Sequence, residues 1–436
     1  LKFGGLAGML EVTLWRICVL AFGLCVSGVR AARECVDAAD HICLRTCFPE
    51  LLQLRFFPVE QAGRADPSPV GLTNKSLGRC VCEWEEQYVQ DFLSACQPIV
   101  PGAVRVFTPA NHTCYRIPAV VQTARGTLLA FAEVRHGSCK DQRKAELAVS
   151  RSTDSGRTWS DAKFIVGSTE HPASNPWPIG MKSGAVAMAY AVDIAFGTTK
   201  VGGDQVVFSD DDGLSWGIGW NISSQVPPTH PGPNAGLELQ LPDGKQRLLV
   251  AAWQQTPLRT LIHYSDDAGM HWRTVAEDSA NFPGLVEPGV ADLGNGELLL
   301  QMRYKHEISR GKAMSRSTDY GMSWSDVFYV HELIGPFCQA SIAAFGGSVY
   351  FANTANHKKR VNMSIHRSDD AGRSWPRSMI VQPQGSKGYS SLVHGAVGAG
   401  YGGLLFESLA IGGIDFFRFP LSLSQVSANM TQDLLI

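Results

Sequence analysis

The sequence predicts an all-β protein: a six-bladed β-propeller with antiparallel four-stranded blades, preceded by a small helical, cysteine-rich region. The main observation is an eight-residue pattern, Ser-x-Asp-x-Gly-x-[Ser/Thr/His]-Trp, which occurs five times. Its copies begin at Ser152, Ser209, Ser265, Ser317 and Ser368, so successive copies start 57, 56, 52 and 51 residues apart. A repeat of this length indicates a stacked or radial architecture in which each repeat is one structural unit.

Short strand-type runs between the copies are the second observation. Runs such as RIPAVVQT, GTLLAFAEV and GELLLQMRY are separated by Gly, Asp and Asn turns, about four to each repeat. Such a unit is typical of an antiparallel blade. The five copies, with flanking strands from Val104 and after Gly402, imply six blades, the last closed by strands from both ends of the domain. We assign residues 101–425 to the propeller and 426–436 to a C-terminal tail.

The repeated pattern itself describes a hairpin turn. Its Asp side chain can accept hydrogen bonds from backbone amides two residues on, and its Gly supplies a positive φ. The Trp is expected to pack the turn onto its own blade. His271 replaces Ser or Thr in the third copy, which a turn should tolerate. The pattern is therefore interpreted as structural.

Composition excludes several classes of protein. The 436 residues are 44% hydrophobic and 18% charged, with a formal net charge of −2, so neither disorder nor nucleic-acid binding is indicated. The sequence has no H-E-x-x-H motif, and its SDDDG segment lacks the distal Glu of a calcium loop. No cofactor or metal is expected.

An apolar run near the N-terminus predicts entry into the secretory pathway. The run Ile17–Gly28 has about 12 residues, the length of a secretory signal core, and small residues suited to cleavage follow it. Residues 1–32 are interpreted as a signal peptide, with a signal anchor or a buried core segment as alternatives. The protein is thus expected to be secreted or lumenal, with lysosomal or membrane-anchored forms as alternatives.

Residues 33–100 differ from the rest of the chain in the spacing of their apolar residues and in their many cysteines. Trp84, Tyr88, Phe92 and Cys96 recur at helical spacing, which predicts a small helical module. An even number of cysteines in a secreted segment indicates disulfides, whereas a zinc site would need paired spacings that are absent. The six cysteines are Cys35, Cys43, Cys47, Cys80, Cys82 and Cys96.

Three further cysteines lie in the propeller. Cys114 and Cys139 could pair if neighbouring strands bring them together, which would leave Cys338 free and buried.

Three arginines stand at the centres or starts of predicted strands: Arg116 in YRIPAVV, Arg303 in LLLQMRY and Arg360 in NTANHKKRVNMSI. Each could be an ordinary surface charge. If they converge, they make a site for a carboxylate or phosphate through bidentate hydrogen bonds.

These residues carry a family resemblance. YRIP (Tyr115–Pro118), followed by five copies of the repeated turn, resembles the sialidases in order and spacing from about residue 105 to 420. The resemblance implies an exo-α-sialidase that releases terminal sialic acids from glycoproteins, glycolipids or oligosaccharides. Gangliosides and other membrane glycolipids are among the expected substrates, and nucleic acid is not.

The resemblance also implies roles for individual residues. Arg116, Arg303 and Arg360 would bind the sialic acid carboxylate, and Glu407 would orient Arg116. Tyr389 in GYSSLV would be the nucleophile, because a neutral phenol approaches the substrate carboxylate more easily than an anion does. Glu287 would be its general base, and Asp141, after AEVR (Glu133–Arg135), the general acid. The segment SNPWPIG (Ser174–Gly180) resembles a loop near the N-acetyl pocket. Arg135 would also bind the substrate, and Glu133, like Glu407, would be an orienting residue.

Simpler interpretations remain for single residues. Asp141 could be a loop charge, Glu287 a turn residue, Tyr389 rim packing, and Arg135 a surface partner of Glu133. At the level of function, the alternatives are a trans-sialidase, a non-catalytic sialic-acid-binding lectin, and an interaction propeller. The trio of Asp141, Glu287 and Tyr389 argues against a lectin, since binding alone does not need it.

Overall fold

The computed structural model describes residues 100, 102–109, 113–141, 145–167, 172–193, 201–304, 311–385, 387–393, 400–408 and 412–423. The signal segment 1–32, residues 33–99 of the cysteine-rich region and the tail 426–436 lie outside these ranges, so the structure does not test the predictions made for them. Within the described ranges, no helix is long and apolar enough to cross a membrane.

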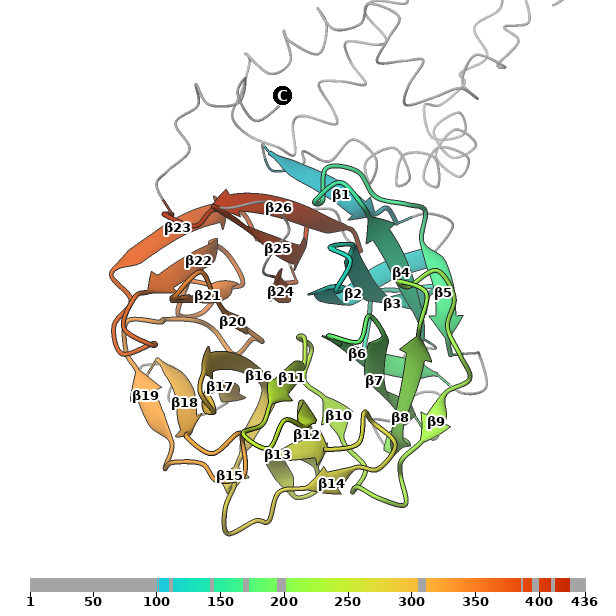
Figure 1. Cartoon of the computed structure of the whole chain (residues 1–436). Helices are drawn as coiled ribbons and strands as arrows, with labels where there is room; N and C mark the ends of the chain where they lie inside the picture. The colour runs from blue at the N-terminus through green and yellow to red at the C-terminus, as the bar shows by residue number, and fades with distance from the viewer. Residues whose placement is uncertain are drawn as a thin grey trace, which may run out of the picture. The chain divides into compact units, whose positions relative to one another are not determined.

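The described strands form six antiparallel sheets arranged in a ring (Figure 1), as the sequence predicts. Blade one contains β2 (Thr113–Gln122), β3 (Leu128–His136), β4 (Ala145–Ser152) and β5 (Lys163–Val166). Blade two contains β6 (Ala173–Gly180), β7 (Val186–Asp193), β8 (Val201–Ser209) and β9 (Trp220–Asn221). Blade four contains β16 (Leu285–Gly294), β17 (Glu297–Tyr304), β18 (Lys312–Ser317) and β19 (Phe328–Val330). Blade five contains β20 (Ser341–Phe345), β21 (Ser348–Thr354), β22 (Met363–Ser368) and β23 (Arg377–Gln382).

Blade three is a six-stranded sheet, because two short strands replace the single innermost strand and two others replace the single outermost strand. Both β10 and β11 pair with β12, and both β14 and β15 pair with β13. Their bounds are β10 (His230–Pro231), β11 (Leu237–Gln240), β12 (Gln246–Gln255), β13 (Leu258–Ser265), β14 (Arg273–Thr274) and β15 (Phe282–Pro283).

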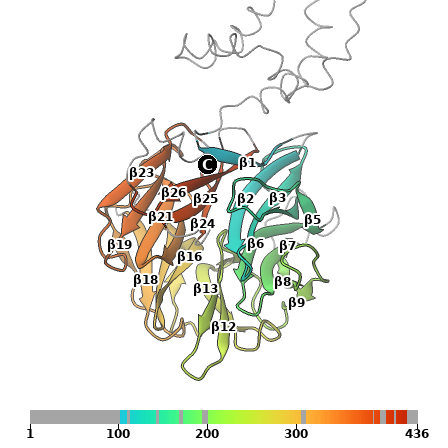
Figure 2. The same cartoon turned by 45° about the horizontal axis from the view of Figure 1, so that its top comes forward.

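Blade six joins the two ends of the propeller. It contains β24 (Ser390–Val393), β25 (Tyr401–Glu407), β26 (Ile414–Pro420) and, as the outermost strand, β1 (Ala103–Phe107). The register pairs Ala103 with Phe417 and Val104 with Phe416. β1 therefore lies beside β26 in both views (Figures 1 and 2), and the predicted closure by strands from both ends is confirmed.

The core lies between the blades. In β3, every residue from Leu128 to Arg135 is buried, because the sheet has a neighbour on each face. Central strands of a propeller therefore read as continuous apolar runs, as strands covered on both faces do. Among the largest fully buried side chains are Trp177, Phe131 and Phe351.

Each copy of the repeated pattern begins at the last residue of the third strand of its blade and leads to the outermost strand. In the first copy, Asp154 Oδ1 accepts a hydrogen bond from Thr158 N at 2.9 Å, and Ser152 Oγ accepts one from Gly156 N at 2.8 Å. The Asp carboxylate thus accepts a hydrogen bond from the backbone amide four residues on. The prediction that it accepts from amides two residues on was wrong. The reason is that two consecutive residues, Ser155 at φ 63° and Gly156 at φ 83°, are left-handed and bend the chain back over the Asp.

Three of the pattern's tryptophans pack across the seams between blades, whereas the ring of Trp375 lies 5.8 Å from that of Phe351 in its own blade, as predicted. Trp159 of blade one lies 5.1 Å from the ring of Phe416 in blade six, and Trp216 of blade two lies 5.6 Å from Phe131 in blade one. Trp324 likewise contacts Phe282 of the preceding blade. The prediction that each Trp packs on its own blade is wrong for these three. Both faces of a blade are covered by neighbours, so a large ring at its outer corner meets the neighbouring sheet.

The pattern's glycine contributes to the same seam. A Cβ added to Gly156 would lie 2.2 Å from the Phe416 ring, and one added to Gly213 would lie 2.7 Å from Leu129 of the preceding blade. Positive φ and close approach both favour glycine here. The repeated turn thus packs against the adjacent blade through its Trp and its Gly, and we call this contact the clasp.

Removing a buried ring from a clasp should destabilise the fold. Trp272 is 3% exposed and donates from Nε1 to Gly269 O at 2.9 Å. We expect Trp272→Ala to lower the free energy of unfolding by about 3–5 kcal/mol, as measured by denaturant titration. The matched control is Trp220→Ala, because Trp220 is 48% exposed, and it should change stability by less than about 0.5 kcal/mol. Equal effects of the two substitutions would contradict the clasp.

Candidate active site

One cavity of about 480 Å³ collects polar side chains from all six blades. Of the nine predicted site residues, eight line it: Arg116, Glu133, Arg135, Asp141, Glu287, Arg303, Arg360 and Tyr389. The ninth, Glu407, binds Arg116 directly. The structure therefore brings together residues up to 291 positions apart in the chain.

Three innermost strands carry the same irregularity where they meet this cavity. The register shifts between Arg116 and Ala119 in β2, between Ser174 and Trp177 in β6, and between Val286 and Gly289 in β16. At each shift a residue with positive φ precedes a proline: Ile117 (55°), Asn175 (54°) and Glu287 (44°). A bulge of this kind re-aims side chains, and proline is tolerated there because its missing N–H is not needed.

Glu407 organises the first part of the site. Its Oε1 accepts from Arg116 Nε at 2.5 Å and from Ile117 N at 3.3 Å, while its Oε2 accepts from Tyr389 N at 3.0 Å. Arg116 and Glu407 are 5% and 2% exposed. Burial lowers the pKa of Arg116, but the Glu407 carboxylate outweighs burial and holds this pKa above its ordinary value. Glu407 thus fixes both a cation and the backbone of Tyr389.

Tyr389 lies between a carboxylate and an arginine. Its Oη donates to Glu287 Oε1 at 2.5 Å and accepts from Arg303 Nη1 at 3.1 Å, while Arg303 Nη1 also contacts Glu287 Oε2 at 2.6 Å. Burial, and then the negative charge of Glu287, raise the pKa of Tyr389 well above its ordinary value. The phenol is therefore protonated at rest, and Glu287 is placed to take its proton.

Arg360 approaches the same tyrosine from the loop between β21 and β22. Its guanidinium carbon lies 5.8 Å from the centre of the Tyr389 ring, and that of Arg116 lies 5.2 Å from it. Arg360 donates to two backbone carbonyls, Lys387 O at 2.6 Å and Phe337 O at 3.4 Å. With Arg303 hydrogen-bonded to the phenol, three arginines converge on Tyr389.

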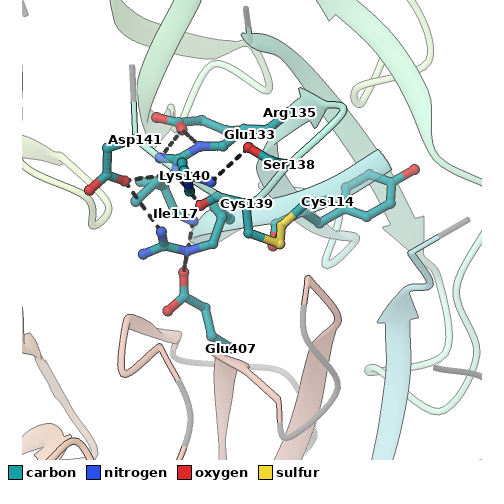
Figure 3. The surroundings of a disulfide bond; sticks show 11 residues. Cys114, Ile117, Glu133, Arg135, Ser138, Cys139, Lys140, Asp141 and Glu407 are labelled. Carbon is teal, nitrogen blue, oxygen red and sulfur yellow. Dashed lines mark hydrogen bonds and ion pairs between the residues drawn. A yellow bond between two sulfur atoms is a disulfide. The ribbon is translucent and has the colours of Figure 1, made fainter. Parts of the chain in front are cut away.

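Asp141 lies in the loop that follows β3 (Figure 3). Its Oδ1 is 2.7 Å from Arg135 Nη1 and 3.4 Å from Arg116 Nη1, although its side chain is 79% exposed. Arg135 in turn binds Glu133 Oε2 through Nε at 2.8 Å and Nη2 at 2.6 Å. Desolvation raises the pKa of Asp141, but the positive charges of Arg135 and Arg116 outweigh it and hold the pKa below its ordinary value.

The structure adds lining residues that the sequence analysis did not assign. His230 and Trp253 stack with ring centres 4.6 Å apart, and Asn175 donates from its backbone to Glu133 Oε1 at 3.0 Å. Asn175 belongs to the SNPWPIG segment, so that segment does reach the cavity. The signal that could have found His230 is its His-Pro dipeptide, which parallels the other inner-strand X-Pro pairs.

Comparison with known proteins gives matches over most of the propeller. Residues 118–400 match the model of the BNR repeat-like domain. The chain is 29% identical over 374 residues to a sialidase of Micromonospora viridifaciens, covering 74% of this chain and 55% of that protein. It is 26% identical over 326 residues to a sialidase of Bacteroides fragilis, covering 65% of this chain and 58% of that protein. The chain thus spans a little over half the length of these two relatives.

Solved structures show the same propeller. The Hadza microbial sialidase Hz136 superposes with a TM-score of 0.64 at 26% identity, covering 73% of this chain and 68% of that one. NanB sialidase from Streptococcus pneumoniae gives a TM-score of 0.62 at 15% identity, covering 76% and 72%, which supports the fold alone. From the match to the BNR repeat-like domain and these relatives, the chain belongs to the sialidase family.

Proposed function

We propose that this protein is a retaining exo-α-sialidase that hydrolyses terminal α-linked sialic acids. The observation that carries the proposal is the position of Tyr389: its hydroxyl lies between Glu287 and Arg303, 2.5 Å and 3.1 Å away, in a cavity lined by arginines. The relatives that share the fold and bear the name sialidase support the same reaction class.

The arginines select the substrate by its carboxylate. Sialic acid carries this group on the anomeric carbon, so binding it by Arg116, Arg303 and Arg360 would place that carbon beside Tyr389. Planar guanidinium groups hold a carboxylate with defined geometry, which a point charge such as lysine does not. Positioning of this kind lowers the barrier of the chemical step.

In the first displacement, Tyr389 Oη forms a bond to the anomeric carbon as the bond from that carbon to the leaving oxygen breaks. Glu287 takes the phenolic proton, which is necessary because the raised pKa leaves no phenolate at rest. Asp141 gives its proton to the leaving oxygen. In the second displacement, Asp141 removes a proton from water, the water oxygen replaces Tyr389, and Glu287 returns the proton to the phenol. Two displacements give net retention.

The general acid must be protonated in the complex, yet the arginines favour the anion of Asp141 in the free protein. The substrate resolves this conflict. Its carboxylate would take hydrogen bonds from Arg116 and bring a negative charge near Asp141, and a nearby like charge raises a carboxyl pKa. Substrate binding would thereby favour the protonated form of Asp141, which is the form that a general acid needs.

Two alternatives are separated by assay. A lectin would need the arginines but not the hydrogen-bonded pair of Tyr389 and Glu287. A trans-sialidase would use the same first step and pass the sialyl group to an acceptor sugar. Product analysis with added lactose distinguishes transfer from hydrolysis.

We also propose that the protein acts in the secretory pathway or outside the cell, on sialylated glycoproteins, glycolipids or oligosaccharides. The disulfide between Cys114 and Cys139 supports an oxidising compartment. Gangliosides and other membrane glycolipids would be reached there.

The nucleophile is tested by trapping. With a 2,3-difluorinated sialic acid, we expect a covalent adduct on Tyr389, detected by peptide mass mapping. Tyr389→Phe should reduce release of 4-methylumbelliferone from its α-sialoside by more than about 100-fold while still binding the planar 2,3-unsaturated analogue. Glu287→Gln should behave similarly, and the two losses should not add, since the pair acts as one unit. An adduct on a carboxylate, or inversion at the anomeric carbon, would refute the mechanism.

The protonation of Asp141 on ligand binding is tested by calorimetry. Binding of the 2,3-unsaturated analogue at mildly acidic pH should take up protons, because its carboxylate raises the pKa of Asp141 from the lowered value of the free protein. Titration in two buffers of different ionisation enthalpy measures the uptake. Asp141→Asn, which cannot titrate, should lose it. Proton release, or unchanged uptake in Asp141→Asn, would contradict this protonation of Asp141.

A further inference from the structure

We propose that the disulfide between Cys114 and Cys139 positions Asp141 for proton transfer, beyond any contribution it makes to stability. The inference rests on the proposed function, because it concerns the general acid of that reaction. Cys139 lies two residues before Asp141, and its partner Cys114 belongs to β2, where it is paired in register with Arg135 of β3. The disulfide therefore ties the acid-bearing loop to the strand that carries Arg116 (Figure 3).

The anchor point is well fixed. Cys114 is 3% exposed, and the backbone of its neighbour Tyr115 donates to Gly412 O at 2.8 Å. A Cβ on Gly412 would lie 2.8 Å from Cys114 Sγ, so the chain before β26 packs closely over the disulfide. Cys114 is therefore fixed by contacts from both blade one and blade six.

Asp141 itself has weaker restraints. In the described part of the chain, its carboxylate is held by ion pairs with Arg135 at 2.7 Å and Arg116 at 3.4 Å, while most of its side chain is exposed. Both contacts depend on charge. Exposed ion pairs contribute little to holding a side chain in one place.

These contacts weaken when the acid is needed. A protonated Asp141 has no negative charge to bind Arg135, and the substrate carboxylate would engage Arg116. In the described part of this loop, three restraints do not depend on the charge of Asp141. They are the disulfide, the hydrogen bond from Arg135 Nη1 to Cys139 O at 3.1 Å and the weaker one from Lys140 N to Ser138 Oγ at 3.3 Å. The first two act on Cys139.

Chain geometry shows how far this restraint reaches. Two extended residues span at most about 7 Å, so fixing Cys139 confines the backbone of Asp141 to a small region beside the cavity. Without the disulfide, Cys139 would keep the hydrogen bond from Arg135, and the nearest strand ends would be His136 and Ala145. Asp141 would then be five and four residues from them and could leave the productive position. A misplacement of about 1 Å can cost about 100-fold in rate.

The effect should depend on the leaving group. An aryl oxygen such as that of 4-methylumbelliferone departs as a stable anion and needs little protonation, whereas a sugar hydroxyl departs only when protonated. General acid catalysis contributes about 100-fold or more for the latter. Loss of positioning should therefore lower kcat/KM for sialyllactose much more than for the aryl sialoside.

The experiment compares the wild type, Cys114→Ala/Cys139→Ala, Asp141→Asn and the triple variant on both substrates. The concentration of folded sites is determined by titration with the 2,3-unsaturated analogue, below the unfolding temperature of each variant. We expect the disulfide variant to lose at least about tenfold in kcat/KM on sialyllactose and less than about twofold on the aryl sialoside, with unchanged affinity for the analogue. In the Asp141→Asn background, removing the disulfide should cost nothing further, because coupled residues give non-additive losses.

A second route uses the intact chain, and it replaces the variant if that variant fails to fold. Dithiothreitol gives two electrons and two protons to the disulfide, forming two thiols and its own cyclic disulfide. Reduction should produce the same substrate-selective loss, and reoxidation should restore activity. The folded Cys114→Ala/Cys139→Ala variant, or otherwise Asp141→Asn on sialyllactose, is the control that the reductant should not affect.

Equal losses on both substrates, or a full additional loss in Asp141→Asn, would show a merely structural disulfide and overturn the inference. If the wild-type chain cleaves neither sialoside, the proposed function is refuted, and the inference falls with it.

Discussion

The pairing of β1 with β26 is the constraint on which the rest of the structure depends. It completes the sixth blade with a strand from the opposite end of the domain and so closes the ring. Arg116 lies nine residues after the end of β1, whereas Glu407 lies in β25 of the closing blade. Their buried ion pair exists because the ring is closed. A buried pair broken on one side is costly, so closure and the site support each other.

The electrostatics of the cavity follow from pairing arginines with carboxylates on its wall. Arg116 binds Glu407, Arg135 binds Glu133, and Arg303 binds Glu287, each at 2.6 Å or less. These carboxylates compensate the burial of the cations and fix their orientation. Each guanidinium has more donors than its partner uses. The site thus combines a modest net charge with several directed donors, which suits a single carboxylate ligand better than a polyanion.

Much of this could be predicted from the sequence because the signals are local. The repeated turn encodes its own hydrogen bonds, and arginines in apolar strands stand out against their surroundings. What the sequence did not show depends on contacts between strands whose relative positions are not encoded locally. The direction of the Trp159 ring is set by Phe416 of blade six, far away in the chain. The stacking of His230 on Trp253 lies within blade three, but it requires β10 and β12 to pair in one particular register.

The prolines that follow the inner-strand bulges have a consequence for the centre of the ring. Pro118, Pro176 and Pro288 have no N–H, and each lies on a strand whose free edge faces the axis. An exposed edge with a full row of donors is a template for another extended chain. By interrupting that row, the prolines discourage an extended peptide from docking along the axis. The cavity at the centre of the ring is thereby left to a small ligand, such as the sugar that we propose as the substrate.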